Sequence, residues 1–221
     1  MKIGIVVALE QEWRAVRDVL DACGGQIAGN EICLIQSGMG KVNAAVRCDR
    51  MIRDFQPDCV ISTGCAGGLA PGLGVLEIVA ASEVVYHDFY CGEPNEWGEV
   101  QGLAKRFVCD PGLLEKALKC GAAGDGRRGR VRAGLVASGD LFVSRREESD
   151  LILSRFPEAI AVDMESAALA HTCLLSGVPF LSLRVISDSV DDDNREGAYQ
   201  DFWATVVETS FSFLKDFLQS L

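Results

Sequence analysis

The chain opens with MKIGIVVALEQEWRAVRDVL (residues 1–20), and this stretch decides the expected fold class. Residues 3–7 form an apolar run as long as a buried strand, and residues 12–20 have the spacing of an amphipathic helix. The further predicted strands are residues 32–35, 59–61, 77–81, 131–137 and 180–186, and the further predicted helices are residues 42–53, 113–119, 164–175 and 199–218. This alternation predicts an α/β fold with a mostly parallel sheet flanked by helices.

Length and charge narrow the class of protein. A chain of 221 residues with 48% hydrophobic residues can organise one hydrophobic core, so we expect a single domain over residues 1–221. The net charge of −11 repels phosphate backbones and anionic membranes. The one basic run, residues 127–132, is short and lacks aromatic residues, which is typical of a solvated turn. We therefore expect neither nucleic acid nor a membrane as a partner.

The nine cysteines indicate a reducing compartment. They are scattered, odd in number and without a C-x-x-C pair, so free thiols in the cytoplasm are expected. Glu10 and Glu12 follow the first apolar run, unlike a signal peptide. Residues 59–76 carry no charge, but their five glycines and Pro71 argue against a lipid-exposed helix. His87 and His171 alone cannot supply a zinc site.

Ligands of open α/β sheets bind beyond the carboxyl ends of the strands, and unusual residues follow several predicted strands. Glu12 follows the first, where it could be a catalyst or an ordinary acid at a helix start. The segment SGMGKVN (residues 37–43) only partly matches G-x-G-x-x-G and could equally be a tight turn. The glycines of TGCAGG (residues 63–68) either shape a turn or let backbone amides approach a ligand.

Two further segments bring carboxylates to strand ends. In AVDMES (residues 161–166), Asp163 suits a helix cap, and Glu165 could bind a polyol such as ribose or remain a surface acid. Asp188 follows a strongly apolar strand, where burial favours the neutral carboxyl and would make it a proton donor; a helix cap is the alternative. The acidic run at residues 191–194 lacks the glycine and distal glutamate of a calcium loop and is expected to be solvated.

Taken in order, these segments resemble one known family. MKIGI with Glu12, SGMGKVN (37–43), TGCAGGLA (63–70), SGDLF (138–142), AVDME (161–165) and Ser187–Asp188 are similar to the bacterial methylthioadenosine/S-adenosylhomocysteine nucleosidases of the purine nucleoside phosphorylase superfamily. The resemblance spans nearly the whole chain. It implies a mixed, partly barrel-like sheet, hydrolysis of the N-glycosidic bond of a 5′-substituted adenine nucleoside without a cofactor, and a homodimer.

The resemblance also implies a role for each candidate site residue. Asp188 would protonate purine N7 and Ser187 would hold that carboxyl, while Glu165 would bind the ribose hydroxyls. Glu12 would deprotonate the attacking water as the sugar gains oxocarbenium character. Phe142 would stack on the base, the backbone of Val143 would read the base edge, and Met164 would pack beneath the sugar. The full set of implied substrate-binding residues is Cys65, Ala66, Gly67, Phe142, Val143, Met164, Glu165 and Ser187.

Two departures from the family pattern keep alternatives open. Cys65 stands where the family commonly has serine, and residues 88–102 differ in the stretch that, in the family, a dimer neighbour contributes to the 5′-substituent pocket. A hydrolase of another 5′-substituted nucleoside, such as futalosine, is therefore one alternative. A phosphate-dependent phosphorylase is a second, although an acid at Glu12 would repel phosphate. A nucleoside-binding regulator without turnover is a third.

Overall fold

A computed structural model describes residues 1–21, 27–122, 130–190, 197, 199, 200, 202 and 212–221. The strands are β1 (Lys2–Val7), β2 (Glu31–Gln36), β3 (Cys59–Gly68), β4 (Ile78–Tyr86), β5 (Phe107–Val108), β6 (Val131–Ser138), β7 (Ala159–Asp163) and β8 (Phe180–Ser189). The helices of the described residues are α1 (Glu10–Asp21), α2 (Lys41–Phe55), α3 (Pro111–Ala122), α4 (Arg146–Arg155), α5 (Ser166–Ser176) and α8 (Ser212–Gln219).

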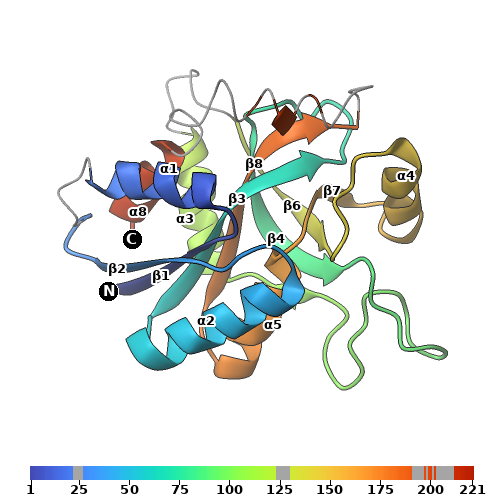
Figure 1. Cartoon of the computed structure of the whole chain (residues 1–221), viewed down its shortest axis with the longest axis horizontal. Helices are drawn as coiled ribbons and strands as arrows, with labels where there is room; N and C mark the ends of the chain where they lie inside the picture. Colours follow the sequence, from blue (N-terminus) through green and yellow to red (C-terminus); the bar gives the residue numbers. More distant parts are fainter. Residues whose placement is uncertain (22–26, 123–129, 191–196, 198, 201, 203–211) are drawn as a thin grey trace.

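The strands form one mixed sheet that closes partly into a barrel. The main path is β2-β1-β3-β7-β6-β4-β5, and β8 pairs with both β3 and β4. The strands β3, β8, β4, β6 and β7 therefore make a closed ring. Five strand pairs are parallel and three are antiparallel. The predicted mixed, mostly parallel and partly barrel-like α/β fold is confirmed (Figure 1).

The antiparallel contact between β3 and β7 positions the site. These two strands overlap only at their carboxyl ends, where Gly67 pairs with Val162 and Gly68 with Ala161. Because β3 and β7 run in opposite directions, their carboxyl ends, and those of the strands parallel to each of them, meet at this overlap. Residues that follow strands from both halves of the sheet can thus line a single cleft.

The core explains why these segments are strands and helices. Every residue of β8 is buried and β1 is buried after its first residue, as expected for strands covered on both faces. Helix α5 is buried along most of its length because its small residues, such as Ala167, Ala168 and Ala170, allow close packing. It lies side by side with α2 on one face of the sheet, whereas α1, α3 and α8 lie toward the other side (Figure 1).

The structure differs from the predicted elements in several places. Strands β3 and β8 are longer than predicted, so Cys65 and Asp188 lie within strands rather than after them. Helix α5 begins at Ser166, two residues later than predicted. The short β5 and helix α4 were not predicted; in α4 the apolar residues are adjacent and leave no helical periodicity. Most of the helix predicted over residues 199–218, and the runs at 127–129 and 191–194, lie outside the described residues.

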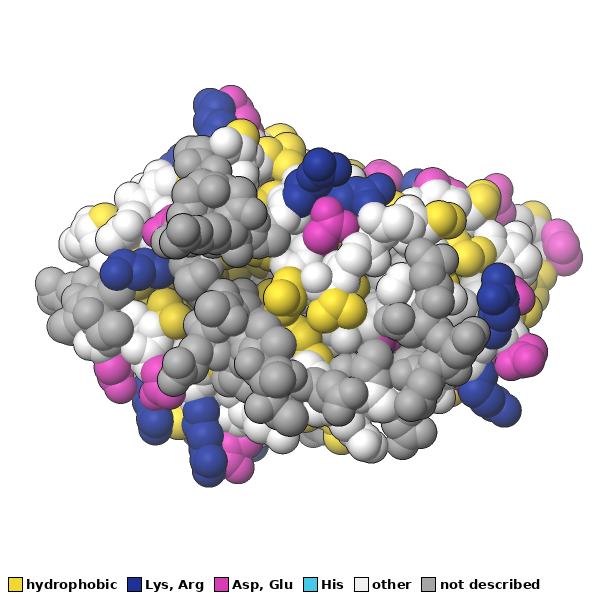
Figure 2. Space-filling model, turned by 90° about the horizontal axis from the view of Figure 1, so that it is seen from above, with side chains coloured by type: hydrophobic (Ala, Val, Ile, Leu, Met, Phe, Trp, Pro, Cys, Tyr) yellow, Lys and Arg dark blue, Asp and Glu magenta, His cyan; other side chains and the backbone are white. Residues whose placement is uncertain are grey.

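Cysteines and charges follow the composition. The eight described cysteines are all free. Among the described helices, none has the length and apolarity needed to cross a membrane. In the space-filling view from above, hydrophobic side chains are exposed near the centre of the face, and most charged side chains lie around its rim (Figure 2).

Candidate active site

One cleft collects all the predicted site residues. It lies at the carboxyl ends of the strands, is open to solvent on one side, and comprises about 590 Å³ of space including part of that opening. Its lining includes Glu12, Cys65, Ala66, Gly67, Phe142, Val143, Met164, Glu165, Ser187 and Asp188. The lining residues that the sequence did not indicate are Ala8, Leu9, Met39, Leu141, Val162, Asp163 and Tyr199. Met39, Leu141, Val162 and Asp163 lie within motifs that carry the resemblance, whereas Tyr199 had no signal in the sequence.

Glu12 is buried and held by the backbone. Its Oε2 accepts hydrogen bonds from the N–H groups of Ala8 and Leu9, both at 2.9 Å, and its Oε1 accepts one from Cys65 N–H at 2.9 Å. The side chain therefore ties the end of β1 to the middle of β3. Burial raises the pKa of Glu12, although the backbone hydrogen bonds and the charge of Arg184 oppose that shift. The carboxylate is rigidly placed and more basic than an exposed one.

Gly64 makes room for this carboxylate. A Cβ at this position would lie 2.5 Å from Glu12 Oε1 and 2.7 Å from Arg184 Nη1, and the backbone has a φ of +150°. Only glycine fits, since both the space and the dihedral exclude a side chain. The glycine was predicted to serve a turn or a ligand; its observed role is to let Glu12 and Arg184 approach the strand.

Beneath the cleft, Arg184 holds a buried polar network. Its Nε lies 2.7 Å from Asp163 Oδ2, and its Nη2 donates to Ser62 Oγ at 2.7 Å and Ser166 Oγ at 3.0 Å. Asp163 also accepts hydrogen bonds from the backbone and the hydroxyl of Ser166, in the first turn of α5. Asp163 thus binds the first residue of α5 and pairs with Arg184, but the N-cap residue of α5 is Glu165 and not Asp163 as expected.

Glu165 stands at the N-cap of α5 and faces the cleft. Its Oε1 accepts a hydrogen bond from Gly40 N–H at 2.9 Å, across the gap to the turn before α2. Burial, and next the negative charge of Asp163, raise the pKa of Glu165 to about 7. Glu165 is therefore a buried carboxylate anchored through one oxygen.

A β-bulge turns Ser187 and Asp188 toward the cleft together. Ala66 pairs with Ile186 and Gly67 with Asp188, which leaves Ser187 as the extra residue. In a regular strand neighbouring side chains point to opposite faces, and the bulge removes that alternation. Ser187 Oγ donates to Asp188 Oδ1 at 2.8 Å, and Asp188 is 5% exposed.

The other end of the cleft is apolar and aromatic. The Phe142 ring is 46% exposed and meets the Tyr199 ring at 5.4 Å between centroids, at an angle of 67°. Val143 beside it is buried. An exposed ring beside a buried backbone can stack on a flat heterocycle and still offer it main-chain hydrogen bonds.

Charge is distributed unevenly over the cleft. Glu12, Asp163, Glu165 and Asp188 line it, and among the described lining residues none is lysine or arginine. The nearby Arg184 is 1% exposed and already paired with Asp163. In the described part of the chain, no group of three or more His, Cys, Asp or Glu side chains is arranged to hold a metal ion. The cleft combines fixed carboxylates with an apolar wall.

The fold and the site together define a class of protein. A family model described as "Phosphorylase superfamily" matches residues 2–219, so the chain belongs to that superfamily. A 5′-methylthioadenosine/S-adenosylhomocysteine nucleosidase of Geobacillus kaustophilus is 35% identical over 222 residues, covering 95% of this chain and 93% of the relative. The chain is a member of this nucleosidase family, as its motifs predicted.

Solved structures agree with this assignment. The nucleosidase of Neisseria meningitidis, solved with methylthio-immucillin-A, has a TM-score of 0.92 at 36% identity and covers 100% of this chain and 99% of that one. A futalosine hydrolase mutant of Helicobacter pylori has a TM-score of 0.89 at 27% identity and covers 100% of both chains. The same architecture therefore accompanies nucleosidases named for different substrates.

Proposed function

We propose that this protein hydrolyses the N-glycosidic bond of 5′-methylthioadenosine or S-adenosylhomocysteine and releases adenine. The observation that carries the proposal is the gathering of all ten predicted site residues in one cleft that holds four carboxylates and, among its described lining, no basic side chain. Carboxylates suit a reaction whose transition state is a cationic sugar. The names of the relatives support the substrate class.

Asp188 is the proposed acid. Ser187 donates its hydroxyl proton to Asp188 Oδ1 and so orients the carboxyl, which would deliver a proton to purine N7. Protonation lets the electron pair of the breaking C1′–N9 bond move into the purine, so that adenine departs as a neutral molecule. Phe142 stacks on the base, and the backbone of Val143 reads its edge.

Glu12 is the proposed base. Three backbone N–H groups hold its carboxylate, which takes a proton from a water molecule as the water oxygen bonds to C1′. Glu165, with Met164 beneath the sugar, binds the ribose hydroxyls. Cys65, Ala66 and Gly67 form the adjoining wall, which the sugar contacts.

Water rather than phosphate is the proposed nucleophile. A phosphate in this cleft would lie among Glu12, Asp163 and Glu165, without an unpaired cation among the described lining residues. Transfer to phosphate requires donors that clamp an anion, and the carboxylates repel one instead. The charge of the cleft therefore favours hydrolysis.

A substrate panel tests the proposal. Adenine release from 5′-methylthioadenosine and S-adenosylhomocysteine, and hypoxanthine release from futalosine, are measured with and without phosphate. We expect adenine release at a rate that does not depend on phosphate. Release only from futalosine would favour the sister hydrolase, which the dissimilar stretch 88–102 and the H. pylori relative support. Strict dependence on phosphate, with the correspondingly 5-substituted ribose 1-phosphate as a product, would establish a phosphorylase.

We also propose that the protein acts as a homodimer through α2 and α5. These helices pack side by side, and the segment after β4 projects beside them (Figure 1). Val42 and Val46 lie one turn apart on α2 and are 74% and 60% exposed. Leu174 and Leu175 are exposed on α5. Apolar side chains gathered on one side of a soluble protein are typical of an interface.

Light scattering after size exclusion tests the dimer. The wild type is expected at twice the monomer mass of 23.8 kDa. Val46→Asp should give monomers, whereas Leu151→Asp, an equally drastic change at an exposed residue of α4, should not. A monomeric wild type would contradict the proposal.

We further propose that residues 1–221 form one domain and that the protein is cytoplasmic. The free thiols support the cytoplasmic location.

A further inference from the structure

We propose that Lys41, with Asp88 and Asp140, is a positioning residue that fixes the Gly40 amide against Glu165 and so sets how tightly the site holds the ribose hydroxyls. The inference rests on the proposed function, because it takes Glu165 as the ribose-binding group. These residues come from three turns, after β2, β4 and β6. We call Lys41, Asp88 and Asp140 the lysine clasp.

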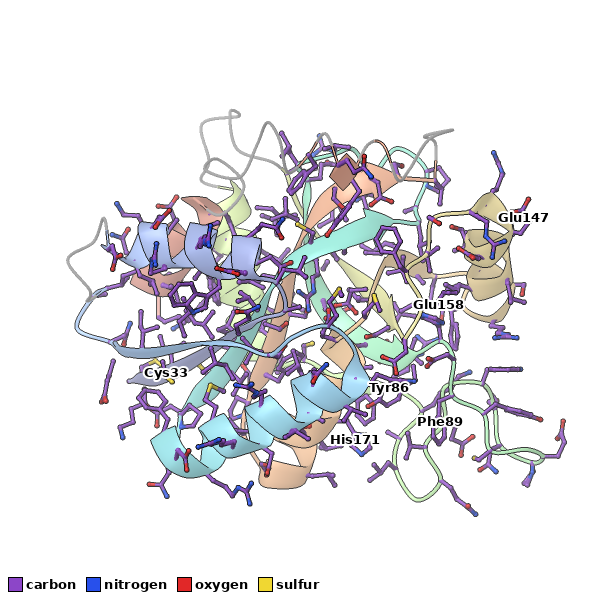
Figure 3. All side chains as sticks on the ribbon, in the orientation of Figure 1. Cys33, Tyr86, Phe89, Glu147, Glu158 and His171 are labelled. Atoms are coloured by element: carbon purple, nitrogen blue, oxygen red, sulfur yellow. The ribbon has the colours of Figure 1, made fainter. Side chains whose placement is uncertain are left out.

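The lysine clasp is closed by four contacts. Lys41 Nζ lies 2.7 Å from Asp88 Oδ2 and 3.6 Å from Asp140 Oδ2. Lys41 N–H donates to Asp140 Oδ1 at 2.8 Å, and Asp140 N–H donates to Asp88 Oδ2 at 2.9 Å. The Lys41 ammonium also lies 5.7 Å from the centre of the Tyr86 ring, which Figure 3 shows near the start of α2. Both the backbone and the side chain of Lys41 are therefore held.

The lysine clasp adjoins the only direct hydrogen bond that, within the described residues, reaches the Glu165 carboxylate. That bond comes from Gly40 N–H, at 2.9 Å. Gly40 has a φ of +86°, and a Cβ there would lie 2.9 Å from Asp140 Oδ1, so the chain passes tightly against the clasp. Since Lys41 follows Gly40 directly, anchoring Lys41 N–H on Asp140 sets the direction of the preceding N–H. With Oε1 occupied, Oε2 of Glu165 is left for the substrate.

The positive charge is what keeps the lysine clasp closed. Two carboxylates converge on the ammonium, and without it they repel each other. Burial acts to raise the pKa of Asp88, but the hydrogen bonds from Lys41 and from the Asp140 backbone outweigh it, and the pKa is lowered. Asp88 is therefore ionised at neutral pH and needs its cation. A neutral residue at position 41 should let Asp140 move away and free the Gly40 peptide.

A sugar-discrimination assay separates this role from a merely structural one. The kcat/KM values for 5′-methylthioadenosine and for its 2′-deoxy and 3′-deoxy analogues are measured for wild type, Lys41→Met and Lys41→Arg. A small misplacement of a positioning group is costly only to a substrate that uses it. Lys41→Met should lower the ribose-to-deoxyribose ratio about tenfold, mainly through the ribonucleoside, and Lys41→Arg should restore most of it.

Two comparisons make the result decisive. Glu165→Gln should lower the same ratio, and Lys119→Met, which breaks an exposed lysine pair on α3, should leave it unchanged. If Lys41→Met slowed all three substrates equally or none of them, the lysine clasp would have no positioning role. If the ratio were unchanged in Glu165→Gln as well, the proposed role of Glu165 would fail instead.

A measurement without substrate keeps the inference testable if no activity is found. The pKa of the Glu165 carboxyl is followed by carbon-13 NMR in wild type and in Asp140→Ala. Removing a negative charge lowers a neighbouring carboxyl pKa, whereas loosening the Gly40 hydrogen bond raises that of Glu165. The two effects have opposite signs. A higher pKa in Asp140→Ala supports the lysine clasp, and a lower or unchanged pKa overturns it.

Discussion

Replacing Glu12 by glutamine should remove catalysis while leaving the fold nearly as stable as before. The substitution keeps the shape of the side chain but exchanges one carboxylate oxygen for an NH₂ group. In the better orientation, the remaining oxygen still accepts from Ala8 and Leu9. The NH₂ group then faces Cys65 N–H and the charge of Arg184, so one buried donor loses its acceptor.

The stability change is a difference between two effects. An orphaned buried donor costs about 1–3 kcal/mol. Against this, the raised pKa of Glu12 means that burying its charge opposes folding, by roughly 1.4 kcal/mol for each pKa unit, and glutamine removes that penalty. The net loss in the free energy of unfolding should stay below about 2 kcal/mol, which corresponds to a fall in Tm of at most about 4–8 °C. Loss of a general base should lower kcat by about 10²–10⁴-fold.

The assay pairs two neighbouring glutamates. Adenine release and thermal melting are measured for Glu12→Gln and for Glu10→Gln, whose side chain is 62% exposed and pairs with Arg14 in the same helical turn. Glu10→Gln should keep wild-type activity and stability. A Glu12→Gln enzyme with more than about a tenth of the wild-type kcat would refute Glu12 as the base.

The remaining predictions concern the surroundings of the carboxylates. Gly64→Ala should lower kcat about 100-fold, because the added Cβ would lie 2.5 Å from Glu12 Oε1 and push the carboxylate aside; near-normal kinetics would show that the space at Gly64 is not needed for catalysis. Arg184→Met leaves Asp163 charged, buried and without its cation, so urea titration should show that the free energy of unfolding falls by about 3–5 kcal/mol. A fall of less than about 1 kcal/mol would mean that the ion pair is not needed for stability. Glu165 has a pKa raised from 4.5 to about 7, so the folded state retains a proton that the unfolded state loses. The contribution of Glu165 to the free energy of unfolding should therefore fall as the pH rises from 4.5 to about 7 and stay constant at higher pH. Urea titrations at several pH values should show that the free energy of unfolding depends less on pH in Glu165→Gln than in the wild type. The same pH dependence in both proteins would argue against the raised pKa of Glu165.

Much of the fold follows from local patterns in the chain. Residues of β1 and β8 are apolar almost throughout, which identifies buried strands without tertiary information. Helix α4 was not predicted because its apolar residues, Ile152 among them, are consecutive and give no helical periodicity. The start of this helix is stabilised instead by the Glu148 side chain. The ends of β3 and β8 were also missed, since Ser62 and Ser187 interrupt the apolar runs while the strand pairing continues.

The sequence predicted which residues belong to the candidate site, but it did not predict how those residues are arranged in space. Motif spacing and the resemblance selected the ten residues that line the cleft. Asp163 was expected only as a cap, and its partner Arg184 was not singled out, because an ion pair between residues 163 and 184 leaves no local signal. The anchoring of Glu165 by Gly40 joins residues 125 positions apart and is equally invisible in one sequence.

The sequence by itself determined the α/β class, the membership of the nucleosidase family and the identity of the proposed acid and base. The α/β class follows from the periodicity of the chain, whereas the family and the proposed acid and base follow from the resemblance of its local motifs to the nucleosidases. Only the tertiary structure decided that Glu12 is held by three backbone N–H groups, that a bulge turns Ser187 and Asp188 to the same side, and that Glu165 is anchored across a gap. The physical reason is that burial, hydrogen bonding and charge pairing depend on distances in space, and the overlap of oppositely running strands sets those distances.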